Sequence, residues 1–242
     1  MEGGALQNPH LKAISPAVSG CDEYEDRFYS RGGALKLGHR VMWLAENLRA
    51  PGYPRQEFQK YVQHLPLKTA DRAAAGRPVD FFQAALEHPS YDGFWKSIST
   101  CRELDRVRVP VLAFGGWYDP FLLNDIEAFR RLRALGREAH LVIGPWAHNT
   151  SSKFPGIDFG PEGDIDFRRF QLEWFERWLQ HKAPARPVPP ARVFVMGVNR
   201  WRDEPHWPPE HVRETEWYLG GGRANGLRGD GVLSPTRPGD HR

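Results

Sequence analysis

Cysteine is scarce in this sequence, and features that define several common protein classes are missing. The 242 residues include only Cys21 and Cys101, with no further Cys or His at metal-ligand spacing. We therefore expect a reduced, buried cysteine pair and no metal site. No apolar run approaches the roughly 18 to 20 residues of a membrane-spanning helix. Residues 1–9 also lack a basic segment followed by an apolar one. These absences predict a soluble cytoplasmic protein without membrane contact.

A large excess of charge of either sign is also lacking. The sequence has 33 basic and 30 acidic residues, which are interspersed and leave a formal net charge of +3. Because the basic residues do not gather in one stretch, nucleic acid is not expected as a partner. Hydrophobic residues make up 40% of the chain and aromatic residues 12%. A chain of this length and composition can bury a substantial core, which predicts a globular fold.

Short apolar runs alternate with helical patterns over most of the chain. Residues 11–18, 109–116 and 139–143 are apolar runs typical of buried strands. Between the last two, residues 126–135 place apolar side chains at helical spacing. Residues 22–99 are instead helical in pattern and are broken by proline and glycine. This order predicts an α/β fold, in which a parallel sheet is covered by helices and 22–99 is a helical insertion.

A further change of pattern follows an aromatic-rich amphipathic helix. The proline-rich stretch 184–190 marks a boundary, beyond which residues 191–196 and 216–219 have the pattern of strands. They are too few to complete a β-sandwich. The predicted domains are the end of the first part of the α/β core (1–21), the helical cap (22–99), the C-terminal part of the α/β core (100–183) and the start of a β-sandwich (191–242).

Two polar residues stand just past the ends of successive predicted strands. Asp119 follows Gly-Gly-Trp-Tyr, and His148 follows Gly-Pro-Trp-Ala. Sites in open α/β sheets form at the carboxyl edge of the strands. A hydrolase with a hydroxyl nucleophile needs an imidazole to accept a proton and a carboxylate to orient that imidazole. The order acid, then histidine, is that of α/β-hydrolases, which predicts a nucleophile upstream.

Each of these residues also has an ordinary structural interpretation. Asp119 precedes Pro120, which is the pattern of a helix N-cap followed by proline. His148 alone is compatible with a surface loop. Aromatic residues beside the pair are predicted to line a pocket for an acyl group, although aromatic rings are equally common in cores. These residues are Trp117, Tyr118, Phe121 and Trp146.

The segments around Asp119 and His148 closely resemble those around the catalytic acid and base of the cocaine esterase and Xaa-Pro dipeptidyl-peptidase group of serine hydrolases. The two segments are Val-Pro-Val-Leu through Gly-Gly-Trp-Tyr-Asp (109–119) and Gly-Pro-Trp-Ala-His-Asn (144–149). The resemblance extends over nearly the whole chain, through residues 9–14, Tyr29 with 32–33, 193–197 and 199–202. These motifs are specific to the group.

The resemblance implies an α/β-hydrolase core, a helical cap inserted after the sixth strand and a C-terminal jelly-roll β-sandwich. It implies that Asp119 is the catalytic acid, His148 the general base and Phe121 a border of the acyl pocket. It also implies hydrolysis of a small-molecule ester or amide without a cofactor. Whether an esterase, acylase or Pro-specific peptidase is encoded stays open.

The sequence departs from the family at the nucleophile. Members carry their serine in a Gly-x-Ser-Tyr-x-Gly elbow, and no Gly-x-Ser-x-Gly occurs here. Ser15 and Ser19 lack the flanking glycines of such an elbow. We therefore expect a truncated chain that is inactive alone. An open sheet edge would then favour self-association or pairing with a complementing chain. The alternative is a non-catalytic fragment or an interaction module.

Overall fold

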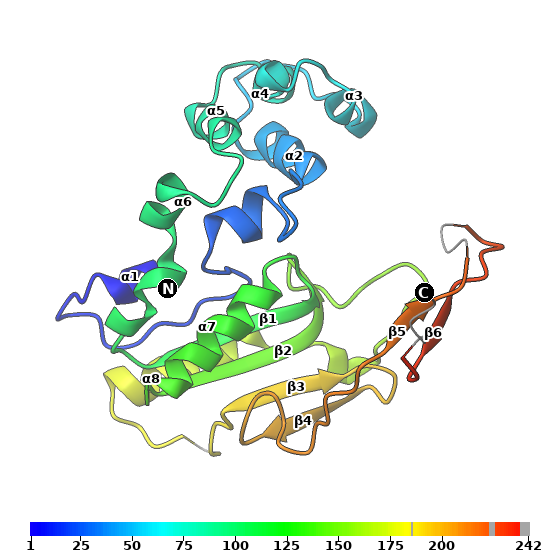
Figure 1. The fold of residues 1–242 in the computed structure, drawn as a ribbon. Helices are drawn as coiled ribbons and strands as arrows, with labels where there is room; N and C mark the ends of the chain where they lie inside the picture. Colours follow the sequence, from blue (N-terminus) through cyan, green and yellow to red (C-terminus); the bar gives the residue numbers. More distant parts are fainter. Residues whose placement is uncertain (185, 223–225, 238–242) are drawn as a thin grey trace. The chain divides into compact units, whose positions relative to one another are not determined.

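The chain divides into two units, Met1–Pro205 and His206–Arg242. A computed structural model describes residues 1–184, 186–222 and 226–237. Figure 1 shows the elements along the chain, which begins with the short helix α1 (Glu2–Ala5). Within the described residues, no helix is long and apolar enough to cross a membrane.

The first unit is organised around one sheet with the order β1-β2-β3-β4 in its described residues. β1 (Val111–Tyr118), β2 (Ala139–Ala147) and β3 (Ala191–Val195) are parallel, and β4 (Arg200–Glu204) returns antiparallel to β3. β1 and β2 are buried along almost their whole length, as expected for parallel strands covered on both faces. The predicted α/β fold is confirmed. β3 and β4 continue this sheet, although the sequence pattern assigns them to the β-rich module.

The apolar run 11–18 lies extended along the edge of β1 that does not pair with β2. Ile14 and Ala17 form parallel bridges with Val111 and Phe114. The amide of Ile14 donates to the carbonyl of Pro110 at 3.0 Å, and the amide of Val18 donates to the carbonyl of Phe114 at 2.8 Å. The run therefore pairs with the sheet as predicted, through separate bridges rather than as a continuous strand.

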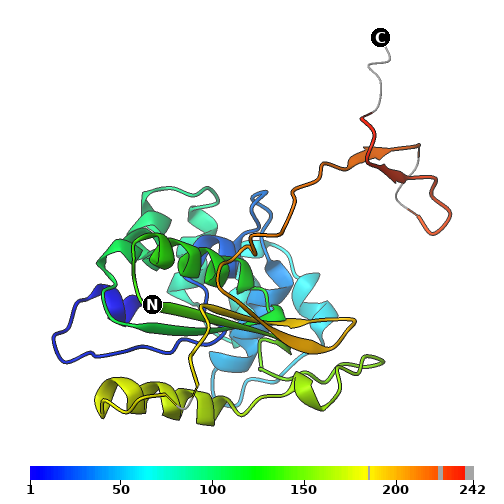
Figure 2. The same ribbon diagram turned by 90° about the horizontal axis from the view of Figure 1, so that it is seen from below.

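Helices cover the two faces of this sheet. α7 (Leu122–Ala134) packs on one face, and α8 (Phe167–Leu179) lies on the other (Figure 2). Because successive strand residues point to opposite faces, Phe114 meets α8, where its ring lies 5.1 Å from that of Phe167. Its neighbour Gly115 meets α7, and a Cβ there would lie 2.6 Å from a leucine side chain of that helix. β1 is thus packed closely on both sides.

The stretch predicted as a helical insertion consists of short helices and turns. They bury their own aromatic-rich core, which includes Tyr24, Phe28, Tyr61, Phe82 and Trp95. The elements of this stretch are the π-helical turn η1 (Glu23–Phe28), α2 (Leu37–Asn47), α3 (Phe58–Val62), η2 (Leu67–Thr69), α4 (Ala70–Ala75), α5 (Asp80–Glu87) and α6 (Gly93–Ile98). The 3₁₀ turn η3 (Thr100–Arg106) follows it. Figure 1 shows α2 to α5 gathered away from the sheet, with η1 and α6 leading to and from them.

Cys21 and Cys101 form a disulfide, so the prediction of a reduced pair is wrong. They are 80 residues apart in sequence, yet their Cα atoms lie 4.9 Å apart. The amide of Cys101 also donates to the carbonyl of Cys21 at 2.9 Å. The two cysteines come together because the chain leaves the sheet region and returns to it at the same place. The bond therefore closes the base of the helical insertion.

The remaining elements are small. A single turn, η4 (Pro161–Gly163), precedes α8. In the second unit, β5 (Tyr218–Gly220) pairs antiparallel with β6 (Val232–Ser234). The strand expected at 216–219 therefore lies one to two residues further along the chain. Leu219 is 84% exposed on this hairpin.

Candidate active site

The ends of β1 and β2 carry the two residues predicted to do chemistry. The strands are neighbours and parallel, with Gly116 of β1 opposite Gly144 of β2. A Cβ on Gly116 would run into the backbone carbonyl of Trp146, so only glycine allows the strands to approach this closely. The register shifts just beyond Gly116. Asp119 and His148 therefore leave the same edge of the sheet side by side.

Asp119 and His148 are in contact. Nδ1 of His148 lies 3.3 Å from Oδ2 of Asp119. The Asp119 side chain is fully buried, whereas that of His148 is 55% exposed. The second carboxylate oxygen, Oδ1, accepts a hydrogen bond from the amide of Phe121 at 2.9 Å. Asp119 thus holds the turn that leads into α7 and contacts the imidazole at the same time, so its two interpretations from sequence are compatible.

This arrangement can hold a proton acceptor in place. A carboxylate on Nδ1 fixes the orientation and tautomer of an imidazole and leaves Nε2 free to exchange a proton with a substrate or nucleophile. The carboxylate is shielded from water, which strengthens its interaction with an imidazolium cation. The exposed ring of His148 is accessible from outside.

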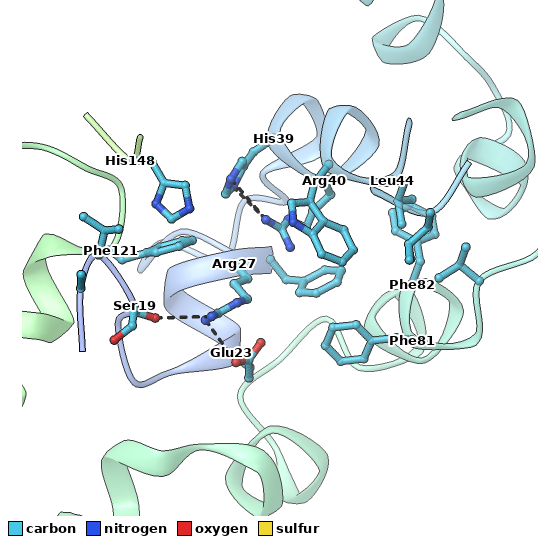
Figure 3. Close-up of a pocket in the computed structure, with 16 residues that line it drawn as sticks. Ser19, Glu23, Arg27, His39, Arg40, Leu44, Phe81, Phe82, Phe121 and His148 are labelled. Carbon is cyan, nitrogen blue, oxygen red and sulfur yellow. Dashed lines mark hydrogen bonds and ion pairs between the residues drawn. The ribbon is translucent and has the colours of Figure 1, made fainter. Parts of the chain in front are cut away.

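His148 borders a cavity of about 500 Å³ between the sheet edge and the helical insertion. Figure 3 shows the side chains around this cavity. Phe121, from the turn after β1, lies in its wall, and the Phe121 ring meets the His148 ring edge to face at 4.9 Å. Phe121 therefore stands where the resemblance to the hydrolase group places a border of the acyl pocket.

The other three predicted pocket aromatics are placed away from this cavity. Trp117 donates a hydrogen bond from Nε1 to the carbonyl of Phe194 in β3 at 2.7 Å. Tyr118 packs on Phe154, with ring centroids 4.5 Å apart. Trp146 is completely buried in the core below α8. The structure brings Phe121 to His148 but does not bring these three residues to the cavity wall.

Sequence reasoning missed the charged residues of the cavity, which come from the helical insertion. Arg27 and Glu23 lie on η1, and His39 and Arg40 lie on α2. One signal was present in the sequence. Arg40 stands four residues before Leu44 on the apolar stripe of its helix, where a charge is unusual.

Burial shifts the titration of these groups. It raises the pKa of Glu23, whose partner Arg27 partly offsets the effect. Burial, together with Arg27, lowers the pKa of Arg40 to about 10. The pKa of His39 is lowered to about 4 by burial and by the positive charges of Arg40 and Lys36. At neutral pH, Arg40 is therefore a cation and His39 is neutral.

A pair of buried carboxyl groups lies behind the turn that carries Asp119. Burial raises the pKa of Asp125 to about 8, with Asp119 and Asp26 adding to the effect. Its Oδ1 accepts from the amide of Gly20 at 2.9 Å, while Oδ2 is buried without a partner. Asp26 accepts hydrogen bonds from the amide of Cys21 and from Asn124. Asp125 is therefore protonated at neutral pH.

Ser19 borders the same cavity as His148. Its hydroxyl donates to the carbonyl of Gly20 at 3.2 Å, and its own carbonyl accepts from Arg27 at 3.4 Å. The structure thus gives the Ser19 hydroxyl a local backbone partner. Within the described part of the chain, no three His, Cys, Asp or Glu side chains are arranged to hold a metal ion.

Two family profiles match this chain. The sequence profile of the X-Pro dipeptidyl-peptidase (S15) family matches residues 3–150, which include Asp119 and His148. The chain belongs to this family. Residues 185–242 match the profile of the X-Pro dipeptidyl-peptidase C-terminal non-catalytic domain.

Curated relatives of this S15 chain are esterases. Cocaine esterase from Rhodococcus sp. is 30% identical over 93% of this chain and 43% of its own length. A putative serine esterase of Mycobacterium bovis is 23% identical over 61% of the chain and 22% of its own length. The chain therefore spans less than half the length of either relative.

Two solved structures share the fold of this chain. An aminopeptidase from a marine sediment Thaumarchaeota archaeon superposes with a TM-score of 0.73 at 21% identity, over 96% of this chain and 39% of that one. An α-amino acid ester hydrolase superposes with a TM-score of 0.64 at 22% identity, over 85% and 36%. At these identities the comparison establishes the α/β-hydrolase type of fold.

Proposed function

We propose that this chain supplies the acid and base of a serine hydrolase that cleaves acyl esters or amides, with Asp119 as the acid and His148 as the base. The main support for this proposal is the 3.3 Å contact between the buried Asp119 carboxylate and the exposed His148 imidazole, at the wall of a cavity. Membership of the S15 family and the esterase names of the relatives support the same chemistry.

The proposed reaction assigns each proton. A serine hydroxyl attacks the substrate carbonyl while Nε2 of His148 takes its proton, and Asp119 stabilises the resulting imidazolium. His148 then returns that proton to the departing alcohol or amine, which leaves an acyl-serine ester. Water, activated by the same imidazole, attacks this ester and releases the acid. Phe121 borders the space in which the acyl group lies.

We place the nucleophile in polypeptide other than these 242 residues, because none of their serines stands in a Gly-x-Ser-x-Gly sequence. The greater length of the relatives is compatible with this assignment. Accordingly, the chain alone is expected to be inactive. A separate chain, or a longer one, that carries the elbow would complete the triad.

A chimera tests this proposal. The part of the Rhodococcus cocaine esterase that precedes its matched region is joined to this chain, and hydrolysis of 4-nitrophenyl butyrate is measured. The chimera is expected to turn over the ester, and the chain alone is not. His148→Ala should abolish turnover, whereas His211→Ala, which changes an exposed histidine, should not. Equal turnover with and without His148 would contradict the assignment of the base.

A further inference from the structure

A buried arginine without a carboxylate partner lies in the wall of the cavity beside His148. Arg40 is only 5% exposed, and its Nε is buried with no hydrogen-bond partner. Among the residues that the structure describes, no carboxylate oxygen lies within ion-pair distance of Arg40. A buried charge without a counter-charge is destabilising, and an anion that enters the cavity would relieve that cost.

Packing fixes the position of this guanidinium group. It lies over the rings of Phe28, at 5.2 Å, and Trp43, at 5.7 Å. Its Nη2 lies 3.2 Å from each ring nitrogen of His39. Figure 3 shows Arg40 and His39 pointing toward the same space as Arg27 and His148. A group held in this way needs little reorganisation to bind a ligand.

A second cation stands closer to the proposed base. Arg27 lies over the ring of Phe121, with its guanidinium carbon 5.0 Å from the ring centroid. The same ring contacts His148 at 4.9 Å, so the cation and the imidazole share one aromatic neighbour. Arg27 is paired with Glu23 at 3.1 Å. This carboxylate neutralises Arg27 and leaves Arg40 without a paired anion, so the cavity wall has an excess positive charge.

His39, which contacts Arg40, is held in its neutral form. Its pKa is lowered to about 4, first by burial and then by the charges of Arg40 and Lys36. The neutral imidazole does not add to the positive charge. It can instead donate a hydrogen bond to an acceptor such as a carboxylate.

The rest of the cavity wall is apolar. Leucine, valine and aromatic side chains from the helical insertion supply most of this surface, among them Leu44, Leu48, Val79, Phe81 and Phe82. A fully hydrated inorganic anion would gain little from such walls. The lining instead fits a molecule with an apolar body and a charged end.

We propose that the cavity binds a substrate whose acyl group has an apolar body and a carboxylate, with Arg40 and Arg27 holding the carboxylate and the scissile carbonyl directed toward His148. This inference rests on the proposed function, because it takes the cavity beside His148 as the acyl pocket. It assigns the enzyme to esters or amides of dicarboxylic acids.

Ligand binding to the intact 242-residue chain tests the proposed carboxylate site, because binding does not require the nucleophile. Monomethyl terephthalate is the anionic probe, and methyl 4-carbamoylbenzoate is its neutral counterpart of nearly the same shape. Dissociation constants are measured by calorimetry at low salt, and the His148 ring protons are followed by NMR. We expect the anion to bind about 10- to 100-fold more tightly, as charge-assisted hydrogen bonds allow, and to shift the His148 signals.

Arginine variants locate the preference. Arg40→Gln should bring the two dissociation constants to within about threefold, and Arg27→Gln should reduce the preference less, because Glu23 already pairs with Arg27. Arg31→Gln is the matched control, since Arg31 is exposed, and it should keep the full preference. Circular dichroism checks the fold. If Arg40→Gln unfolds, the proposal is still tested by the preference of the unaltered chain for the anionic probe and by the effect of Arg27→Gln on that preference.

Several results would overturn the inference. These are equal binding of the two probes, binding of neither, tighter binding of the anion without a shift at His148, or an undiminished preference in a folded Arg40→Gln variant. A different result would contradict the proposed function, namely ester turnover by the chimera that does not depend on His148. A chimera that hydrolyses neutral esters as fast as anionic ones would retain the function and reject the substrate class.

Discussion

The two walls of the cavity differ in how they are built. On the sheet side, Asp119 and His148 sit at the ends of neighbouring parallel strands, and their contact follows from the register of β1 and β2. On the side of the insertion, Arg27 and Arg40 come from separate helical elements that are held by an aromatic-rich core. The proposed chemistry therefore depends on strand geometry, whereas the proposed recognition depends on how the insertion packs.

The largest expected effect belongs to the sheet side. In the chimera, His148→Ala should lower kcat for ester hydrolysis by about 10⁶-fold, as removal of a triad histidine does in another hydrolase. Asp119→Asn should cost about 10⁴-fold, because the imidazole loses its orienting anion. Steady-state kinetics measure both. Losses below about tenfold would show that the strand-end pair is not the catalytic centre.

The disulfide tests the insertion side. Changing Cys21 and Cys101 together to serine opens the base of the helical insertion, and we expect a loss of about 2–4 kcal/mol in the free energy of unfolding. Urea unfolding with and without dithiothreitol measures this. Reductant should destabilise the unaltered chain and leave the double variant unchanged. Insensitivity of the unaltered chain to reductant would mean that the bond contributes nothing to its stability.

Gly116→Ala tests how closely the strands must approach. The added Cβ would meet the carbonyl of Trp146, which is backbone and cannot turn aside. We expect a loss of about 1–3 kcal/mol in stability, as overpacking typically causes, and slower hydrolysis by the chimera. The control is Gly93→Ala, because nothing lies within 4 Å of a Cβ there. Unchanged stability and activity in Gly116→Ala would show that this approach does not set the geometry of the pair.

Asp125 lies on α7, which follows the turn of Asp119, and it accepts a hydrogen bond from the amide of Gly20, just before the insertion. Its raised pKa predicts that the stability of the chain depends on pH. Its pKa is about 8 in the folded chain against an ordinary value of 3.8, so the folded chain retains a proton that the unfolded chain releases. Stability should therefore fall as pH rises between about 4 and 8, by up to about 1.4 kcal/mol per pH unit.

Comparing Asp125→Asn with the unaltered chain isolates this contribution. Urea unfolding at several pH values should show a shallower decline for Asp125→Asn. Asp105→Asn, at an exposed carboxylate, should follow the unaltered chain. If Asp125→Asn declines as steeply as the unaltered chain, the carboxyl of Asp125 is not the proton carrier.

The sheet side could be anticipated from sequence because its determinants are local. Apolar runs give the strands, their order along the chain gives a parallel sheet, and residues just past the strand ends must share an edge. Asp119, His148 and Phe121 all lie within a few residues of such an end. Trp146 shows the limit of this reasoning, since it lies within β2 and points into the core.

The insertion side could not be anticipated in the same way. Short helices broken by proline and glycine leave their mutual packing undetermined by local pattern, so the approach of Arg27 to Phe121 emerges only in the folded chain. The disulfide was missed for the same reason, because 80 residues separate two cysteines that meet in space. Arg40 on an apolar helix stripe was the one local sign of the charged wall.

Labelling with a fluorophosphonate, located by mass spectrometry, tests most directly whether this chain provides acid and base to a serine carried elsewhere. We predict no serine adduct on the folded 242-residue chain, and an adduct at the elbow serine of the chimera that forms far more slowly after His148→Ala. A serine adduct on the chain alone would contradict this, and so would chimera labelling at an unchanged rate without His148.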